Sequence, residues 1–445
     1  MLLSLGSGLN FAPFDCLGDL ARKRFLLALV SREVAKKIRN TPAPFRYLIG
    51  FSRLFSARIN CTQNKSNGEE LESKAASRRF HLKSNMDRTG VLLINIGTPD
   101  EATPEAVGRY LREFLMDEYV LDMPFWKRWP LVNLIIVPRR KHDSAKHYQE
   151  IQTEDGSVLM FHTRQFADGL SAELANRDGD YVVEIGMRYG NPSITDALSK
   201  LKASNVNRVV VLPLYPQYTQ SSFVTAVVEA KKRAREIGLE DKLSFVDPFY
   251  DDAGFIKAWA QRVAEHVGDR ELDHVVFTYH GIPTRHIKKM DPSGGHCLAS
   301  PDCCAEIGAV NQNCYRAQCF ATSRAIAQEL DLEADRFTTC FQSQFGRDEW
   351  IGPSLDDLLP ELPGRGLKRV AILSPSFVAD CLETVEEIGI RGREDFKKAG
   401  GEELTLVPCL NSDPAWITAA ANLITNSQSQ QLRAKAAGAN EHATG

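Results

Sequence analysis

The chain has 445 residues, which is long enough for two domains with well-buried cores. Hydrophobic residues make up 43% of it and charged residues 25%, as is typical of a globular protein and not of a disordered or membrane-spanning chain. The net charge is −3, so no overall basic field favours nucleic acid, and we expect no nucleic-acid partner.

Residues 1–85 differ from the rest because they carry 15 Lys and Arg against 6 Asp and Glu. They contain no apolar run long enough to span a membrane and no secretory signal. We interpret them as a disordered extension or a non-native upstream translation, with an organellar transit peptide as the alternative. The ordered part is expected to begin at Met86. We expect a reducing, cytoplasmic location, where clustered cysteines favour a metal over disulfides.

From residue 89 onward, short apolar runs alternate with amphipathic stretches. Strands are predicted at Gly90–Ile96, Tyr181–Met187, Arg208–Leu214, Leu243–Val246, His274–Tyr279, Phe337–Phe341, Val370–Leu373 and Leu404–Pro408. Helices are predicted at Thr103–Met116, His162–Ala175, Ser193–Ala203, Ser222–Gly238, Gly254–Val267, Tyr315–Leu330, Ala379–Lys398 and Pro414–Asn426. This order predicts an α/β protein with two Rossmann-like, doubly wound domains, at 86–268 and 269–410. A C-terminal helix (411–429) and a solvated tail (430–445) follow.

An apolar stretch at 115–138 interrupts this alternation and contains three prolines. We expect no helix to run through it. It is either buried core or part of an exposed apolar lip at 107–140, which would face a membrane or a hydrophobic substrate. Arg139 and Arg140 follow directly and could hold the carboxylates of an otherwise hydrophobic ligand.

His280 follows an apolar strand and precedes Gly281-Ile282-Pro283, a tight exit from the sheet. A lone histidine is more often structural than catalytic. Ligands of open α/β sheets, however, bind beyond the carboxyl ends of the strands. We therefore expect His280 to be a metal ligand or a proton acceptor.

Asp380, Glu383 and Glu387 would share one face of the helix predicted at Ala379–Lys398. Acidic residues in a first helical turn are usually solvated and favoured by the helix dipole. Because this segment also follows a strand, we interpret the three carboxylates as a ridge that relays protons or guides a cation.

Five cysteines fall within 23 residues, in an insertion at 291–319. They are Cys297, Cys303, Cys304, Cys314 and Cys319. Four thiolates suffice for an iron–sulfur cluster or for a structural zinc ion. Zinc modules usually present C-x2-C pairs, which this segment lacks, so the spacing favours the cluster.

Six motifs along residues 89–425 resemble the successive signatures of ferrochelatases. They are GVLLINIGTPD, GMRYGNP, LPLYPQYTQSS, FTYHGIP, FQSQFGRDEWIGP and SPSFVADCLETVEEI. The resemblance implies a chelatase fold with a porphyrin cleft between the two domains. It also implies a lyase that inserts Fe²⁺ into protoporphyrin IX and releases two protons.

The resemblance also implies roles for individual residues. His280 and Glu383 would be catalytic and contact the iron, and Glu387 would continue the carboxylate path. The residues implied to bind the porphyrin are Ile96, Arg139, Arg140, Tyr148, Arg188, Tyr215, Tyr218, Trp350 and Phe377. Cys381 stands where animal relatives have a histidine.

The cysteine insertion is similar to that of bacterial ferrochelatases with an internal [2Fe–2S] cluster. Cys297, Cys314 and Cys319 would be ligands, and Cys303 and Cys304 would supply one more between them. The apolar lip implies peripheral contact with the inner face of the cytoplasmic membrane. The alternatives are coproporphyrin as the substrate, a non-catalytic haem-binding protein and a cluster-based sensor on the same fold.

Overall fold

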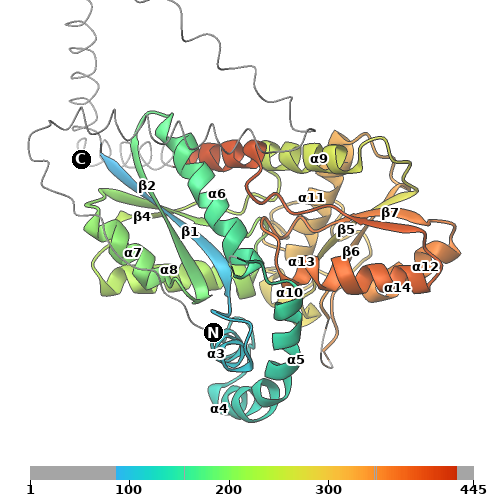
Figure 1. Cartoon of the computed structure of the whole chain (residues 1–445), viewed down its shortest axis with the longest axis horizontal. Helices are drawn as coiled ribbons and strands as arrows, with labels where there is room; N and C mark the ends of the chain where they lie inside the picture. Colours follow the sequence, from blue (N-terminus) through green and yellow to red (C-terminus); the bar gives the residue numbers. More distant parts are fainter. Residues whose placement is uncertain (1–86, 155, 345, 347, 428–445) are drawn as a thin grey trace, which may run out of the picture. The chain divides into compact units, whose positions relative to one another are not determined.

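Two parallel four-stranded sheets form the framework of the protein (Figure 1). The computed structural model describes residues 87–427, except 155, 345 and 347. The predictions for 1–85 and for the tail 430–445 lie outside these residues. The first sheet has the order β2-β1-β3-β4 and the second the order β6-β5-β7-β8.

All eight predicted strands are confirmed, and so is the α/β class. The strands are β1 (Arg88–Thr98), β2 (Asp180–Gly190), β3 (Arg208–Pro213), β4 (Leu243–Phe245), β5 (His274–His280), β6 (Phe337–Gln342), β7 (Arg369–Leu373) and β8 (Glu403–Leu406). β1 and β5 are central strands and are almost entirely buried, because helices cover both faces of a parallel sheet.

The helices before β5 are α3 (Pro104–Leu115), α4 (Phe125–Pro130), α5 (Val137–Glu150), α6 (Val158–Ala175), α7 (Ile194–Ala203), α8 (Thr225–Glu236) and α9 (Ala253–Val267). Short π or 3₁₀ segments accompany them: η1 (Leu131–Ile136), η2 (Gln220–Val224) and η3 (Glu240–Lys242). Those after β5 are α10 (Thr284–Met290), α11 (Tyr315–Glu329), α12 (Leu355–Gly364), α13 (Leu382–Val385), the π segment η4 (Glu387–Gly392) and α14 (Arg393–Lys398). A further helix is described over 414–427.

One apolar core joins the two sheets. Val91 of the first sheet and Phe277 of the second belong to it, together with residues of α6, α9 and α11. The helix at 414–427 follows the second sheet in the chain but packs beside α6 and α9, and Figure 1 shows it in red next to α9. Its Trp416 stacks on Phe166 of α6 with ring centroids 5.5 Å apart. α7 and α8 pack on the other face of the first sheet, and α12 and α14 on the other face of the second.

The expectation that no helix runs through 115–138 holds for residues 116–124, which form turns and bends, but it is wrong from Phe125 onward. Helical structure continues from Phe125 through η1 to Glu150 despite Pro130 and Pro138. The wider π turn of η1 accommodates the interruption, since the N–H of Val137 donates to the carbonyl of Val132, five residues back. The side chain of Asn133 also donates to the carbonyl of Trp129, at 2.9 Å.

Three other helices differ from the prediction. Neither α12 nor α10 was predicted. α12 contains Pro360 and Pro363, which disfavour a helix interior, and α10 is only seven residues long. The helix predicted at Ala379–Lys398 begins at Leu382, since Cys381 is fully extended.

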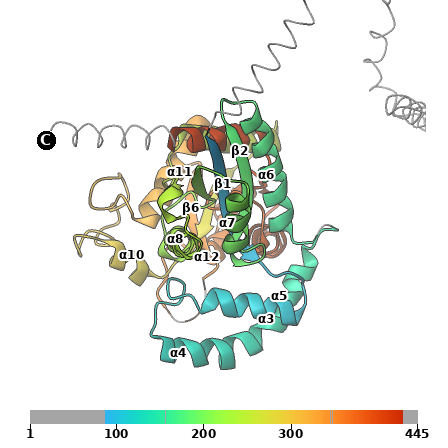
Figure 2. The ribbon, with the colours of Figure 1, turned by 90° about the vertical axis from the view of Figure 1, so that its left-hand side faces the viewer.

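Helices α3, α4 and α5, with η1, form a projection over residues 104–150 that includes the lip predicted at 107–140, and from here on we call the whole projection the lip. Figures 1 and 2 both show it extending away from the two sheets. Large apolar side chains are exposed on it: Phe125, Trp126, Trp129, Leu134 and Ile135. Among the described residues, no helix has the length and apolar character needed to cross a membrane.

The cysteine segment (residues 291–314) connects α10 to α11 and consists of turns without regular structure. It extends to one side of the protein together with α10 (Figure 2). It is therefore an insertion beside the second sheet, not part of it.

Candidate active site

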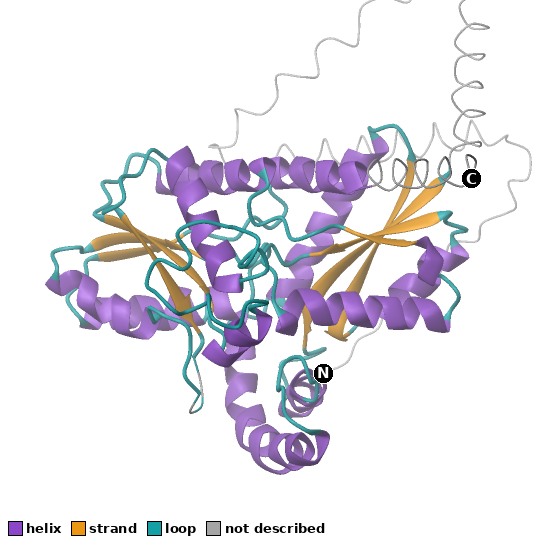
Figure 3. Cartoon of the chain, turned by 180° about the vertical axis from the view of Figure 1, so that it is seen from behind, coloured by secondary structure: helices purple, strands orange, loops and turns teal. Residues whose placement is uncertain are grey.

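Two adjoining cavities lie near the carboxyl ends of the strands of both sheets. Figure 3 shows many loops in this region between the sheets. The apolar cavity has an empty volume of about 1240 Å³ and the acidic cavity one of about 1480 Å³. Six residues line both: Ile96, Phe114, Leu159, His280, Phe377 and Cys381. His280, the last residue of β5, thus stands at the boundary between two chemically different compartments.

Two hydrogen bonds hold His280 in place. Its Nδ1 lies 2.7 Å from the carbonyl oxygen of Gly281, and a carbonyl can only accept, so Nδ1 carries a hydrogen. In the neutral ring, Nε2 is then the acceptor. The hydroxyl of Tyr315 donates to the carbonyl of His280, at 2.8 Å. A proton acceptor with a fixed tautomer is therefore available at the cavity boundary.

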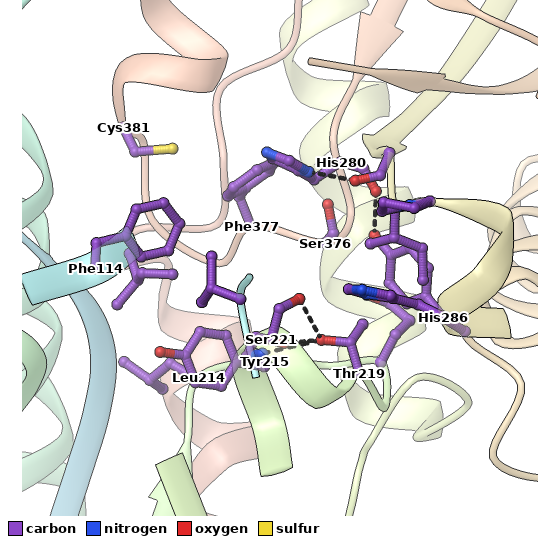
Figure 4. A pocket seen from close by; sticks show the side chains of 18 of the residues that line it. Phe114, Leu214, Tyr215, Thr219, Ser221, His280, His286, Ser376, Phe377 and Cys381 are labelled. Carbon is purple, nitrogen blue, oxygen red and sulfur yellow. Dashed lines mark hydrogen bonds between the residues drawn. The ribbon is translucent and has the colours of Figure 1, made fainter. Parts of the chain in front are cut away.

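The apolar cavity contains four of the predicted porphyrin residues: Ile96, Tyr215, Trp350 and Phe377. Figure 4 shows Tyr215 and Phe377 on opposite sides of the space, with His280 beside Phe377. The hydroxyls of Tyr215 and Ser376 are buried and have no hydrogen-bond partner among the described residues. Burial raises the pKa of Tyr215, so its hydroxyl remains a neutral donor. A flat apolar ligand with a few polar groups fits such a lining.

The lining of the apolar cavity includes Arg285, His286 and Asp348, which the sequence did not single out. Arg285 lies 2.8 Å from Asp122 of the lip and 3.4 Å from Asp348. His286 lies 3.3 Å from the same Asp122. Burial lowers the pKa of His286, and the nearby Asp122 opposes that shift. These contacts connect the lip to α10. Because the paired residues lie far apart in the sequence, no local pattern could have predicted them.

The acidic cavity contains Glu383 and Glu387, as predicted, and also Glu386 and Asp356. Ser343 donates to a Glu387 carboxylate oxygen at 2.6 Å. Burial raises the pKa of Glu387, and the hydrogen bond from Ser343 opposes that shift. Carboxylates and an imidazole around one space can hold a divalent cation or pass protons.

Asp380 does not belong to this carboxylate group. It is buried and accepts hydrogen bonds from the side chain of Asn411 at 2.7 Å and from the N–H of Cys409 at 3.2 Å. It lines neither cavity. The predicted ridge of three carboxylates is therefore wrong at this position, because the backbone is extended up to Cys381.

The other five residues predicted to bind the porphyrin differ in whether they line a cavity. Arg140 and Tyr148 line the acidic cavity. Arg139, Arg188 and Tyr218 line neither cavity. The guanidinium of Arg188 is bound to Asp117 and Thr225, so it fastens the lip to the first sheet.

The structure also brings the cysteines of the insertion together. Cys303 and Cys304 have their sulfurs 3.7 Å apart, and the thiols of Cys297 and Cys304 both contact that of Cys314. Arg316 donates to the sulfur of Cys304 at 3.2 Å. The thiol of Cys319 lies on α11, where it pairs with Tyr315, and burial raises its pKa.

Comparison with known proteins identifies relatives over most of the chain. The ferrochelatase family model matches residues 88–428. A ferrochelatase of Bdellovibrio bacteriovorus is 42% identical over 76% of this chain and 99% of its own length. One of Azotobacter vinelandii is 43% identical over 75% of this chain and 97% of its own. Among solved structures, SirB from Bacillus subtilis with Fe³⁺ is 13% identical, with a TM-score of 0.45 over 77% of this chain and 98% of that one.

The raised pKa of Glu387 makes a prediction about stability. A folded-state pKa above the unfolded value of 4.5 gives stability that is present at low pH and is lost as the pH rises through the folded-state pKa. Glu387→Gln removes this loss. The variant should therefore gain free energy of unfolding relative to the wild type as the pH rises from about 4 to about 8, measured by urea denaturation. Glu394→Gln, at an exposed glutamate of α14, is the control and should follow the wild type. Parallel curves for Glu387→Gln and the wild type would contradict the burial of a raised-pKa carboxyl.

Proposed function

The chain belongs to the ferrochelatase family, and on that premise we propose that it inserts Fe²⁺ into protoporphyrin IX. The reaction replaces two pyrrole N–H protons with one dication, so it needs a proton acceptor and a route for iron. No electron transfer is required. Protohaem and two protons are the products.

The position of His280 carries this proposal. Its Nε2 is the acceptor nitrogen, and its ring borders both cavities. A porphyrin in the apolar cavity would present its pyrrole protons to this nitrogen. Glu383 and Glu387 in the acidic cavity would hold the incoming Fe²⁺ and carry released protons away. The proton acceptor and the Fe²⁺ would then approach the porphyrin ring from separate cavities and would not compete for the same residues.

Substrate choice rests on the lining of the apolar cavity. Ile96, Tyr215, Trp350 and Phe377 would pack against the macrocycle, and Arg140 and Tyr148 would meet its carboxylates from the acidic cavity. Arg139, Arg188 and Tyr218 would support the site from outside the lining. Coproporphyrin carries two more carboxylates than protoporphyrin and needs partners for them. The arginine that lines the apolar cavity, Arg285, already has Asp122 and Asp348 as partners, which favours protoporphyrin.

His280→Ala should lower the rate of metal insertion by at least about 10²-fold, because the proton acceptor is lost. Porphyrin affinity should stay within about threefold, since aromatic packing supplies most of the contact. Absorbance of the metalloporphyrin and porphyrin fluorescence titration measure the two quantities. His142→Ala, at an exposed histidine of α5, should retain both. Near-normal turnover in His280→Ala would rule out this role.

We propose that the cysteine segment holds a [2Fe–2S] cluster. The donor set fits, since pairwise contacts connect four buried thiols, and Arg316 and the N–H of Leu298 donate to two of the sulfurs. Zinc is the alternative and needs its four ligands around one ion, whereas the cluster divides them between two irons. We prefer the cluster to zinc because the segment lacks the C-x2-C pairs that zinc modules usually present.

The expected set was Cys297, Cys314 and Cys319 with one of Cys303 and Cys304. The contacts between the thiols favour a different set, namely Cys297, Cys303, Cys304 and Cys314, with Cys319 as the spare thiol held by Tyr315. Such a cluster would brace the segment between α10 and α11. It stands apart from both cavities, neither of which any of these five cysteines lines.

Anaerobically purified protein should therefore be coloured and contain two irons and two sulfides per chain. Cys314→Ser should lose the colour, and Cys340→Ser, at a buried cysteine of β6, should keep it. Cys303→Ser and Cys319→Ser decide the ligand set, because the former should bleach the protein and the latter should not. A colourless protein with one zinc per chain would contradict the cluster.

We propose further that the lip rests peripherally on an anionic membrane surface, where protoporphyrin partitions. The five exposed apolar side chains of α4 and η1 form its contact face, and Lys127 lies among them.

Leu134→Glu should weaken binding to vesicles of phosphatidylglycerol and phosphatidylethanolamine about tenfold, because it removes one large apolar side chain from the contact. Co-sedimentation measures this. Val228→Glu, at a comparably apolar exposed position on α8, should bind like the wild type. Equal binding of both variants would place the membrane contact elsewhere or exclude it.

A further inference from the structure

One face of α11 carries buried polar side chains that the proposed reaction does not use. Tyr315, Gln318 and Thr322 are spaced i, i+3 and i+7, so they lie on the same face of the helix. Gln318 is only 2% exposed and Thr322 is fully buried, although buried helix positions usually hold apolar side chains. Buried polar groups are costly unless they are hydrogen-bonded, so the partners of this face indicate what it does.

The side chain of Gln318 joins two other segments. Its Oε1 accepts from the N–H of Tyr218 at 2.6 Å, and its Nε2 donates to the carbonyl of Gln312 at 2.6 Å. Tyr218 belongs to the loop after β3 (residues 214–219), and Gln312 belongs to the cysteine segment. Because both ends of the amide are used, the two bonds fix its orientation. Gln318 therefore anchors the loop to α11 and is itself held by the cysteine segment.

Thr322 anchors the same loop at a second point. Nε2 of Gln217 donates to its hydroxyl at 3.2 Å, and this hydroxyl donates to the carbonyl of Tyr250 at 2.8 Å. The amide of Gln217 is as buried as that of Gln318. Two consecutive residues of the loop are thus bound to α11, one through its side chain and the next through its backbone.

This loop forms one wall of the apolar cavity. Four of its residues line the space: Leu214, Tyr215, Gln217 and Thr219. His280 stands on the other side, beside Phe377 (Figure 4), and its carbonyl accepts from Tyr315 of the same helix face. One face of α11 therefore sets the separation of two walls between which a flat ligand has to fit.

We propose that Gln318 and Thr322 are positioning residues for porphyrin binding, because they hold the loop at 214–219 where its side chains pack against the macrocycle. This inference rests on the proposed function and deepens it by naming what shapes the porphyrin cavity. Neither residue lines the apolar cavity, so each acts through the loop. A loop that is ordered before the ligand arrives lowers the entropic cost of binding.

Gln318→Leu removes both hydrogen bonds and keeps a side chain of similar size. The Kd and the KM for protoporphyrin should rise about tenfold, because the ligand then has to order the loop. kcat and the KM for Fe²⁺ should change by less than about twofold, since the loop in the complex returns to the same place. Porphyrin fluorescence titration gives the Kd, and initial rates of metal insertion give the kinetic constants.

Hydrogen exchange of the full-length protein reports on the loop without any turnover. In the absence of porphyrin, the amides of residues 214–219 should exchange at least about tenfold faster in Gln318→Leu than in the wild type. Saturating porphyrin should restore their protection.

Three further variants separate a role in positioning from a general loss of stability. Ser323→Ala is the matched control, because Ser323 is the next residue of the helix, is equally buried and bonds to Tyr279 of β5 at 2.9 Å. It should leave the porphyrin Kd and the exchange of the loop unchanged. Thr322→Val keeps the shape of the side chain and should raise the Kd in the same direction as Gln318→Leu. Gln318→Glu keeps an oxygen for the N–H of Tyr218 and should bring the Kd to within about threefold of the wild type.

An unchanged porphyrin Kd in both Gln318→Leu and Thr322→Val would overturn the positioning role. An equal rise of the Kd in Ser323→Ala would overturn it as well, since any buried polar group of α11 would then have the same effect. A fall in kcat with an unchanged Kd would place these residues in the chemical step and contradict the proposal. If the wild type binds porphyrin but inserts no iron, the proposed function fails, and the Kd and exchange measurements still decide the role of Gln318 and Thr322.

Discussion

The apolar core shared by the two sheets is the constraint on which the site depends. Side chains of β1 and β5 meet in it through α6, α9 and α11, and the helix at 414–427 returns to the first sheet to complete it. Trp416 contributes most visibly, since it stacks on Phe166 and Phe249. Burial of large apolar side chains is the main favourable term in folding. It therefore fixes the two sheets in one arrangement, with the carboxyl ends of their strands around common cavities.

In this arrangement the two cavities have linings of different chemical character. The apolar side of the junction is lined by aromatic and aliphatic groups from both halves, and the acidic side by carboxylates of α13 and η4. His280 borders both, and the carbonyl of Gly281 fixes its tautomer. Charged groups are expensive to bury unless they are paired. The separation therefore gives a hydrophobic ligand and a dication each a suitable environment on the two sides of His280.

The first turn of α11 connects the cysteine segment to this junction. Tyr315 donates to the carbonyl of His280, and the next residue, Arg316, contacts both the sulfur of Cys304 and the carbonyl of Gly352. The segment thus packs against the elements that carry His280 and Trp350, although none of its thiols lines a cavity. This position suits the bracing role that we propose for the segment.

The sequence by itself determined the eight strands, the α/β class and the place of His280 at a strand end, because apolar runs and strand-end residues are local patterns. It also singled out Glu383, Glu387 and the cysteines. It misjudged Asp380 and the helical structure from Phe125 to Glu150, where hydrogen bonds to Asn411 and a π turn across prolines override local preference. The proximity of His147 to Glu386 and the contacts of Asp122 with Arg285 and His286 were decided only by the tertiary structure. These groups lie far apart in the chain, and only the packing of the lip against the second half brings them together.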